Sequence, residues 1–367
     1  MKQLLYPGLH CPFPSQINKH VDVLEESALE WVLHFNLLAK ESTYKRFCKS
    51  KFFLLAASAY PDSNLEELKL ASDWLSWVFI WDDQCDLSDL GKKPEVLKIF
   101  HKRFLEILNG AEVTSQDIPL TVALSNLKER TLARGSLIWF HHFICSFEEW
   151  LQGCIDEATI RAQGIIPDID TYIMTRKSSI GVDTFLALTE FCHSLNIPDF
   201  LRKHETLTRL KFLTGHIIAC CNDIFSASRE MSSGDVNNLV VILHYKQQIP
   251  VNQAINRVVQ MHNTAIQLMM DLEISIPKFG EEVDAEVKKF ILGMHAWIRS
   301  NHDWYSQTGR YQSLEGLEIT QNHGVDDFEY DFCRGNLEIV SREKLINWMF
   351  ANSYLISETL NQDMVNS

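Results

Sequence analysis

The chain has 367 residues, of which 46% are hydrophobic and 22% charged, and its formal net charge is −14. Such a composition can bury a sizeable core, either as one large domain or as two or three smaller ones. The negative charge argues against nucleic acid or an anionic membrane surface as the main partner, because neither would be attracted electrostatically.

The nine cysteines are scattered and form neither Cys-x-x-Cys pairs nor a plausible disulfide ladder. This pattern is typical of a reduced cytoplasmic protein. The first residues lack the long apolar segment of a signal peptide, and the chain has no run of about 18 apolar residues that could span a membrane. We therefore expect a cytoplasmic protein without a membrane span.

Taken in chain order, the sequence predicts helices and no run of alternating strands. Residues 1–20 contain Pro7, Pro12 and Pro14, which favour an extended N-terminal segment. Apolar residues at helical spacing then predict helices at 22–40, 43–60, 64–84, 94–108, 117–133, 136–155, 183–194, 207–232, 236–247, 251–273 and 282–304. The expected fold is all-α, a bundle of about ten or more helices around a central space.

The helix predicted at 64–84 ends in a cluster of carboxylates. Asp82 and Asp86 share one helix face, and Asp83 lies about 100° around the axis. Like charges packed this way repel one another, so the cluster is tolerable if a divalent cation neutralises it or if the helix end is well solvated.

A second polar cluster lies within the helix predicted at 207–232. Asn222, Ser226 and Glu230 recur at four-residue spacing and form one stripe of oxygen ligands. Such hard ligands suit Mg²⁺ that keeps some waters and shares its remaining positions with substrate phosphates. A helix end with ordinary polar residues is the alternative. The presence of both clusters in one chain is more specific than either alone.

Together the two clusters resemble the metal motifs of class I terpene synthases of the microbial type, which ionise prenyl diphosphates. The aspartate-rich motif matches Asp82, Asp83 and Asp86, and the second metal motif matches Asn222, Ser226 and Glu230. The family's diphosphate-contacting positions match Arg176, Arg229, Arg310 and Tyr311. The resemblance covers about residues 10 to 315 and is nearest to germacrene-forming sesquiterpene synthases. It implies a catalytic domain at 21–315 and an extension of unknown role at 316–367.

The resemblance also implies a substrate pocket. In the family, a diphosphate-sensing arginine, here Arg176, is followed by a linker residue and an effector residue. By position these are Ser179 and Ile180. An acidic linker is common there, and Ser179 departs from it. Gly181 could mark a helix break beside the substrate or be a plain packing glycine. Aromatic rings that could stabilise a cation, or simply pack in the core, are Phe79, Trp81, Phe185, Trp304 and Tyr311.

The implied reaction is the cyclisation of farnesyl diphosphate to a cyclic C15 hydrocarbon, germacrene-type or derived from it, with release of diphosphate. The family implies three Mg²⁺ ions, for which Mn²⁺ can substitute, and a monomer or homodimer. Alternatives are a synthase acting on geranyl or geranylgeranyl diphosphate and a non-catalytic isoprenoid-binding protein. A prenyl-chain elongating synthase would need a second Asp-Asp-x-x-Asp where this chain has Asn222-Asp223-x-x-Ser226. A proton-initiated cyclase would need an Asp-x-Asp-Asp segment, which is absent.

The C-terminal extension fits the resemblance less well. Residues 326–331 form an acidic-aromatic cluster, which could be a solvated linker or a further metal site. Residues 343–360 predict a weakly amphipathic helix.

Overall fold

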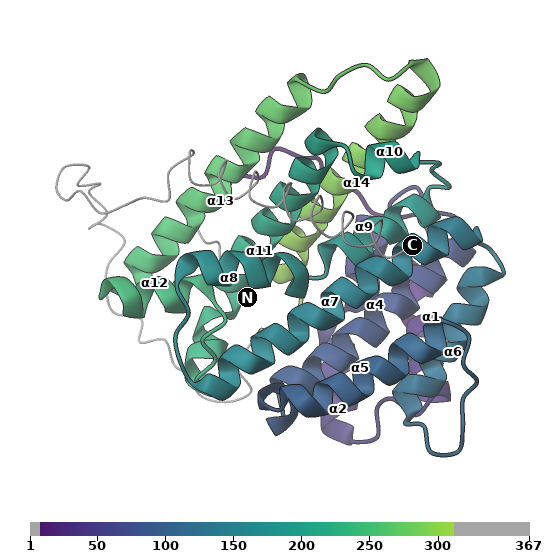
Figure 1. Ribbon diagram of the computed structural model, residues 1–367, viewed down its shortest axis with the longest axis horizontal. Coiled ribbons are helices and arrows are strands. Elements are labelled where there is room, and N and C mark those ends of the chain that lie inside the picture. The colour runs from purple at the N-terminus through teal and green to yellow at the C-terminus, as the bar shows by residue number, and fades with distance from the viewer. Residues whose placement is uncertain (1–7, 312–367) are drawn as a thin grey trace, which may run out of the picture.

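The computed structural model describes residues 8–311, and every regular element within that range is helical (Figure 1). This confirms the all-α prediction. The elements are α1 (Val21–His34), α2 (Glu41–Ser50), α3 (Phe52–Ala59), α4 (Leu65–Asp86), the 3-10 helix η1 (Asp89–Lys92), α5 (Pro94–Leu108), α6 (Pro119–Leu132), α7 (Leu137–Gln163), α8 (Ile169–Ser179), α9 (Val182–Cys192), α10 (Asp199–Arg202), α11 (Glu205–Ser233), α12 (Leu239–Gln247), α13 (Val251–Ile274) and α14 (Glu281–Tyr305).

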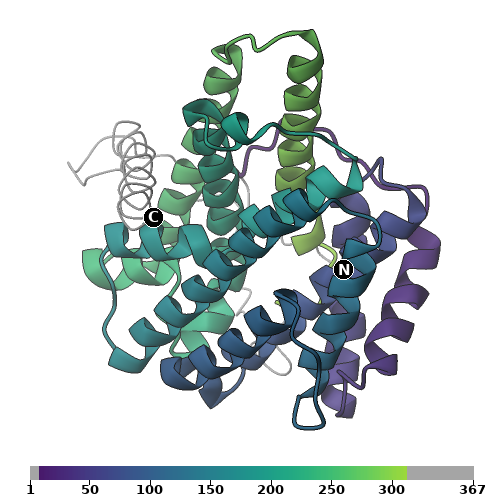
Figure 2. The ribbon, with the colours of Figure 1, turned by 45° about the vertical axis from the view of Figure 1, so that its right-hand side comes forward.

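Three long helices, α4, α7 and α11, carry most of the packing. The helix α11 packs against α13, α14 and α8, whereas α7 packs against α8, α9 and α5. The helices α13 and α14 run in opposite directions and extend together beyond the rest of the bundle at the top of Figure 2. The bundle therefore surrounds the C-terminal halves of α4 and α11, where the two polar clusters lie.

From Leu70 to Trp81 the helix α4 is almost entirely buried, and its side chains there are mostly apolar. The indole of Trp74 meets Phe143 of α7 edge-on at 4.7 Å, and that of Trp77 meets Phe104 of α5 at 5.0 Å. All four rings are fully or almost fully buried. Such large buried rings hold the helix in one place, so the aspartates at its end have a fixed position.

The helix predicted at 43–60 is broken in the structure. Lys51 separates α2 from α3 in the left-handed region, with φ of 51°. The break frees the carbonyl of Ser50, which accepts hydrogen bonds from the Trp304 indole and the Thr308 hydroxyl, both at 2.8 Å. These donors lie far away in the sequence, so helical periodicity could not reveal the break.

Other helices also differ from the prediction: α1 ends at His34 rather than at residue 40, and the short α10 was not predicted. The helix α7 continues to Gln163 and ends at Gly164, which has a left-handed φ of 64°. The helix α8 was not predicted, because its short segment has little amphipathic pattern; the Asp168 side chain begins it by accepting a hydrogen bond from the Thr171 N–H.

The described part of the N-terminal segment, residues 8–20, has no regular helix, as predicted. The Asn18 side-chain amide donates to the carbonyls of Tyr60 and Ser63, and the Phe13 ring stacks on His295 at 3.9 Å. The segment is thus held against α14 and the end of α3.

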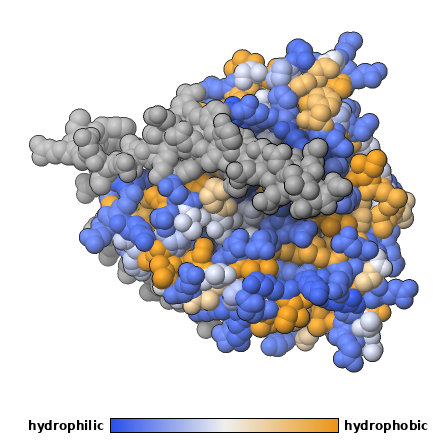
Figure 3. Space-filling view, in the orientation of Figure 1, coloured by the Kyte–Doolittle hydropathy of each residue, from blue (hydrophilic) through white to orange (hydrophobic). Residues whose placement is uncertain are grey.

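The surface in the view of Figure 3 mixes hydrophilic residues with scattered apolar ones. None of the described helices is long and apolar enough to cross a membrane. The eight cysteines within residues 8–311 are free. The predicted extension at 316–367, with its acidic cluster at 326–331 and helix at 343–360, lies outside the described residues.

Candidate active site

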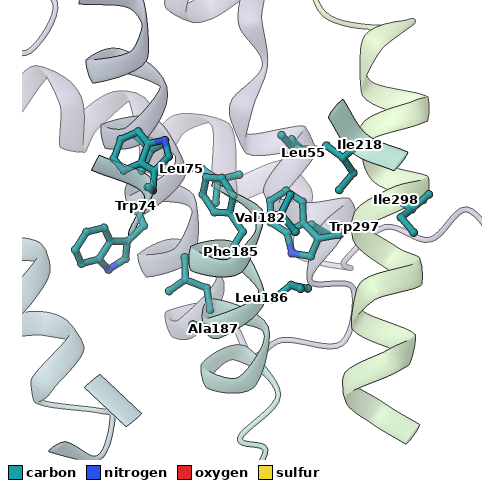
Figure 4. Close-up of a cluster of buried hydrophobic side chains, with 14 of the residues drawn as sticks. Leu55, Trp74, Leu75, Val182, Phe185, Leu186, Ala187, Ile218, Trp297 and Ile298 are labelled. Carbon is teal, nitrogen blue, oxygen red and sulfur yellow. The ribbon is translucent and has the colours of Figure 1, made fainter. Parts of the chain in front are cut away.

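A cavity lies among α4, α7, α9, α11 and α14. One end is apolar, where Phe185 of α9 stacks on Trp297 of α14 at 4.9 Å (Figure 4). The other end is polar and is formed by the ends of α4 and α11. The apolar lining consists of Leu55, Val78, Phe79, Trp150, Ile180, Val182, Phe185, Ile218, Trp297 and Trp304.

At the end of α4 every aspartate of the first cluster is paired with arginine. Asp82 accepts a hydrogen bond from Arg310 at 2.6 Å, and Asp86 accepts one from Arg161 at 3.0 Å. Asp83 accepts two from Arg46, both at 2.8 Å. Asp82 and Asp86 line the cavity, whereas Asp83 does not.

The pKa values separate the first two aspartates. Burial and the neighbouring Asp86 carboxylate raise the pKa of Asp82 to about 7. Burial alone would also raise the pKa of Asp83, but Arg310 and Arg46 outweigh it and hold that pKa below its ordinary value. Of these two aspartates, Asp82 is therefore the one that gains more from a further positive charge.

The second cluster lies on α11, as predicted. The Asn222 side-chain oxygen accepts from Arg176 at 2.7 Å, and its amide donates to the Tyr305 and Tyr311 hydroxyls at 2.8 and 3.1 Å. Glu230 accepts from Asn238 at 2.8 Å and from Arg229 at 3.0 Å.

The members of the second cluster differ in access. Asn222 and Glu230 line the cavity, whereas Ser226 is fully buried and accepts from Asn238 at 3.2 Å. Burial raises the pKa of Glu230.

The polar end of the cavity contains buried donors that lack an acceptor. Nε of Arg176, Nη1 of Arg229 and Nε of Arg310 have no hydrogen-bond partner. Such donors are costly when unsatisfied, and a ligand with several anionic oxygens would satisfy them. Arg176, Arg229, Arg310 and Tyr311 all line the cavity, so the chemistry of this end fits a diphosphate.

A divalent cation also fits the donor set. The two clusters face one cavity with carboxylate and amide oxygens, the ligands that Mg²⁺ prefers. Within residues 8–311, however, no group of three or more His, Cys, Asp or Glu side chains is arranged to hold a metal ion. The reason is that the carboxylates point toward arginines.

Of the five predicted aromatic residues, four line the cavity and one does not. Phe79 stacks on Phe52 at 4.4 Å, and the guanidinium carbon of Arg310 lies 5.1 Å from the Phe79 ring centre. Trp81 lies elsewhere: its indole donates to His101 at 3.1 Å, and the ring is buried against Phe104. The cavity role predicted for Trp81 was wrong, because the helix turns this side chain toward α5.

Gly181 marks the predicted helix break. The helix α8 ends at Ser179 and α9 begins after Gly181, whose φ of 71° is left-handed. A Cβ there would lie 3.1 Å from Trp150, so both the backbone and the space favour glycine. Ser179 and Ile180 line the cavity, whereas Gly181 is not among the lining residues.

Comparison with known proteins agrees with this geometry. Residues 73–267, which include both clusters, match the family model described as "Terpene synthase family 2, C-terminal metal binding". The chain belongs to the terpene synthase family.

Similar proteins cover most of the length of this terpene synthase. Germacrene A synthase from Nostoc punctiforme is 60% identical, over 88% of this chain and 99% of that protein. A (+)-T-muurolol synthase ((2E,6E)-farnesyl diphosphate cyclizing) from Roseiflexus castenholzii is 31% identical, over 82% of this chain and 92% of that protein. The crystal structure of germacradien-4-ol synthase from Streptomyces citricolor superposes with a TM-score of 0.73, at 24% identity over 83% of this chain and 99% of that chain, which shows the same fold.

Several polar lining residues of this terpene synthase were not predicted. Glu157 and Arg161 lie on the last turns of α7, and Asp235 and Asn237 lie between α11 and α12. The only sequence signal was a Glu–Arg pair at four-residue spacing, which is common on helix surfaces. The pair lies beyond residue 155, where the predicted helix ended, and within the part of α7 that only the structure shows.

Proposed function

We propose that this terpene synthase ionises farnesyl diphosphate and cyclises it to a C15 hydrocarbon, germacrene-type or derived from it, with release of diphosphate. The observation that carries the proposal is one cavity in which an apolar aromatic chamber adjoins a polar end built from both metal motifs. The 60% identity to a germacrene A synthase over nearly all of that protein supports the substrate and the product class.

We also propose which residues hold the divalent cations expected of this metal-binding family. Asp82 and Asp86, with Asp83 behind them, would bind on one side, and Asn222, Ser226 and Glu230 on the other. The expected ions are three Mg²⁺, for which Mn²⁺ can substitute. When bound, Mg²⁺ acts as a Lewis acid that neutralises charge on the leaving diphosphate.

The arginines have two possible partners. Arg310 now pairs with Asp82, and Arg229 lies 3.0 Å from Glu230. A diphosphate in the polar end would accept hydrogen bonds from these guanidinium groups, from Arg176 and from the Tyr311 hydroxyl. The carboxylates would then be free to bind cations, so no charge would remain unpaired in a buried place. These donors stabilise the charge that develops as the C–O bond breaks.

The apolar end governs the carbocation. Its walls exclude water and hold the chain so that a distant double bond can attack C1. Each desolvated aromatic face, such as that of Phe79 or Trp304, stabilises a cation by roughly 1–2 kcal/mol. Among the described lining residues no histidine occurs, and the carboxylates lie at the polar end. We propose that the released diphosphate takes the final proton.

The catalytic unit that we propose is residues 21–315, acting as a monomer or homodimer. The test is incubation of the full chain with Mg²⁺ and geranyl, farnesyl or geranylgeranyl diphosphate, followed by gas chromatography with mass spectrometry. We expect a cyclic C15 hydrocarbon from the farnesyl substrate. A preference for another chain length would favour the alternative substrates, and binding without hydrocarbon or alcohol from all three would contradict an enzyme.

A further inference from the structure

Glu157 is a buried carboxylate at the polar end of the cavity that belongs to neither metal motif. It lies on α7 and is 8% exposed. One carboxylate oxygen accepts from the Ser179 hydroxyl and from Nη1 of Arg176, the latter at 3.3 Å. The other accepts from Arg161 at 3.3 Å. A buried carboxylate with three donors is held in one position.

Glu157 and Asn222 hold the two branches of the Arg176 guanidinium. Nη1 donates to Glu157, and Nη2 donates to Asn222 of the second motif at 2.7 Å. Nε of the same group is buried and has no acceptor. The planar fork is thus fixed in orientation, and its Nε remains an unused donor.

The same carboxylate is tied to the helix break. Ser179 is the last residue of α8, Ile180 lines the cavity, and Gly181 has the left-handed φ of 71°. One turn before Glu157, a Cβ on Gly153 would lie 2.4 Å from the Ser179 backbone nitrogen, so α7 and α8 touch here through their backbones. This close contact sets the distance between Glu157 and the break.

We propose that Glu157 is a positioning residue that couples Arg176 to the cavity wall at Ile180. The inference rests on the proposed function. When a diphosphate binds Arg176, the Glu157 carboxylate keeps the guanidinium aligned and, through the Ser179 hydroxyl, keeps the Ser179–Gly181 backbone in place. Ser179, at the end of the helix that carries Arg176, has no charge, and Glu157 of α7 supplies a carboxylate at this place.

The decisive experiment moves the carboxylate from one side of the hydrogen bond to the other. Ser179→Asp places a second carboxylate against Glu157, so repulsion should lower kcat roughly tenfold or more. Glu157→Gln removes one of the two carboxylates that face Arg176, the other being Asp223, whose Oδ1 lies 3.5 Å from Nη2. It should lower kcat by a similar factor, about tenfold or more, with a smaller change in KM and a changed product ratio. The double variant has a single carboxylate again and should recover most of the activity that Ser179→Asp loses.

A second readout does not depend on turnover. In calorimetric titration with inorganic diphosphate and Mg²⁺, Glu157→Gln should bind diphosphate roughly threefold or more weakly than the parent. The matched control is Glu148→Gln, which removes an exposed carboxylate from the same helix and should leave both readouts unchanged. Ser179→Ala, which removes only the hydroxyl, should change the product ratio with little change in diphosphate affinity. If Glu157→Gln does not fold, this variant tests the hydrogen bond between Ser179 and Glu157 in its place.

The proposal is overturned if Glu157→Gln, folded by circular dichroism, keeps the parent kcat, product ratio and diphosphate affinity. It is also overturned if the double variant is no better than Ser179→Asp alone. A parent protein that is inactive on all three prenyl diphosphates would contradict the proposed function instead, and the diphosphate titrations would still test the role of Glu157.

Discussion

The two motif helices, α4 and α11, present oxygen ligands to one cavity, but their side chains are held in different ways. The aspartates of α4 are paired with Arg46, Arg161 and Arg310, which are 37, 75 and 228 residues away in the chain. On α11 the neutral Asn238 side chain donates to both Ser226 and Glu230, only 12 and 8 residues away, in addition to the arginines that donate to Asn222 and Glu230.

The difference follows from charge and helix position. Asp86 is the last residue of α4, where the helix dipole disfavours a carboxylate, so the cluster needs external positive charge. The α11 stripe contains one carboxylate among neutral ligands and needs correct orientation more than charge. We infer that the α4 aspartates depend on distant arginines for charge balance, whereas the α11 ligands depend on the single Glu230 charge and on Asn238 for its orientation.

The largest effect is expected for Glu230→Gln, which keeps the size of the side chain and removes the charge that would offset a cation. Turnover should fall by roughly a thousandfold or more, while circular dichroism and thermal melting stay near those of the parent. The exposed Glu282→Gln on α14 is the matched control. Near-normal turnover in the folded variant would remove Glu230 from the site.

The two cavity-facing aspartates of α4 should differ from each other. Asp82→Asn should lower turnover by about a hundredfold, and Asp86→Asn by only about tenfold, because Asp82 pairs with Arg310, one of the proposed diphosphate ligands, whereas Asp86 pairs with Arg161. Kinetics over a range of Mg²⁺ concentrations measures both. Equal losses would mean that α4 acts as an undivided charge cluster.

Asn238→Ala tests the orientation of the α11 ligands. The Asn238 side chain also accepts hydrogen bonds from the N–H groups of Val240 and Val241 at the start of α12. Its removal should raise the Mg²⁺ concentration required for activity about tenfold and lower the free energy of unfolding by about 1 kcal/mol. Asn252→Ala, at an exposed position of α13, provides the comparison. An unchanged Mg²⁺ requirement would show that Ser226 and Glu230 hold their positions without it.

Phe79→Leu changes the wall of the cavity three residues before Asp82 and leaves the motif charges intact. Losing a π-face worth roughly 1–2 kcal/mol shifts competing branches by about tenfold, so the product mixture should change while turnover stays comparable. Gas chromatography of products from the variant and the parent decides it. The parent product profile would mean that this ring serves packing only.

The smallest effect is the pH dependence of the free energy of unfolding. It should be similar for a buried histidine near each of the two motif helices. Burial lowers the pKa of His101, beside α4, and of His216, on α11, to about 4. The unfolded chain binds these protons near pH 6.5, so the free energy of unfolding should fall as pH drops from about 6.5 toward 4, by about 1 kcal/mol per histidine at pH 5.5.

Urea unfolding at pH 8 and pH 5.5 measures this loss. His101→Phe should reduce the difference between the two pH values, even though it removes the hydrogen bond from Trp81. His141→Phe at the surface should leave that difference as it is. No reduction in His101→Phe would contradict the neutral buried imidazole.

The sequence by itself determined the helical class, because helical periodicity is local and each long helix carries it. It also determined the two motifs, because Asp82 with Asp86, and Asn222 with Ser226 and Glu230, share a helix face by spacing alone. Only the tertiary structure decided which side chains face the cavity, such as Phe79 but not Trp81, since that depends on how α5 and α14 pack against α4. The tertiary structure also decided three other features: the arginine partners of Asp82 and Asp83, the break at Lys51 and the place of Glu157. Each of them depends on contacts between residues far apart in the chain.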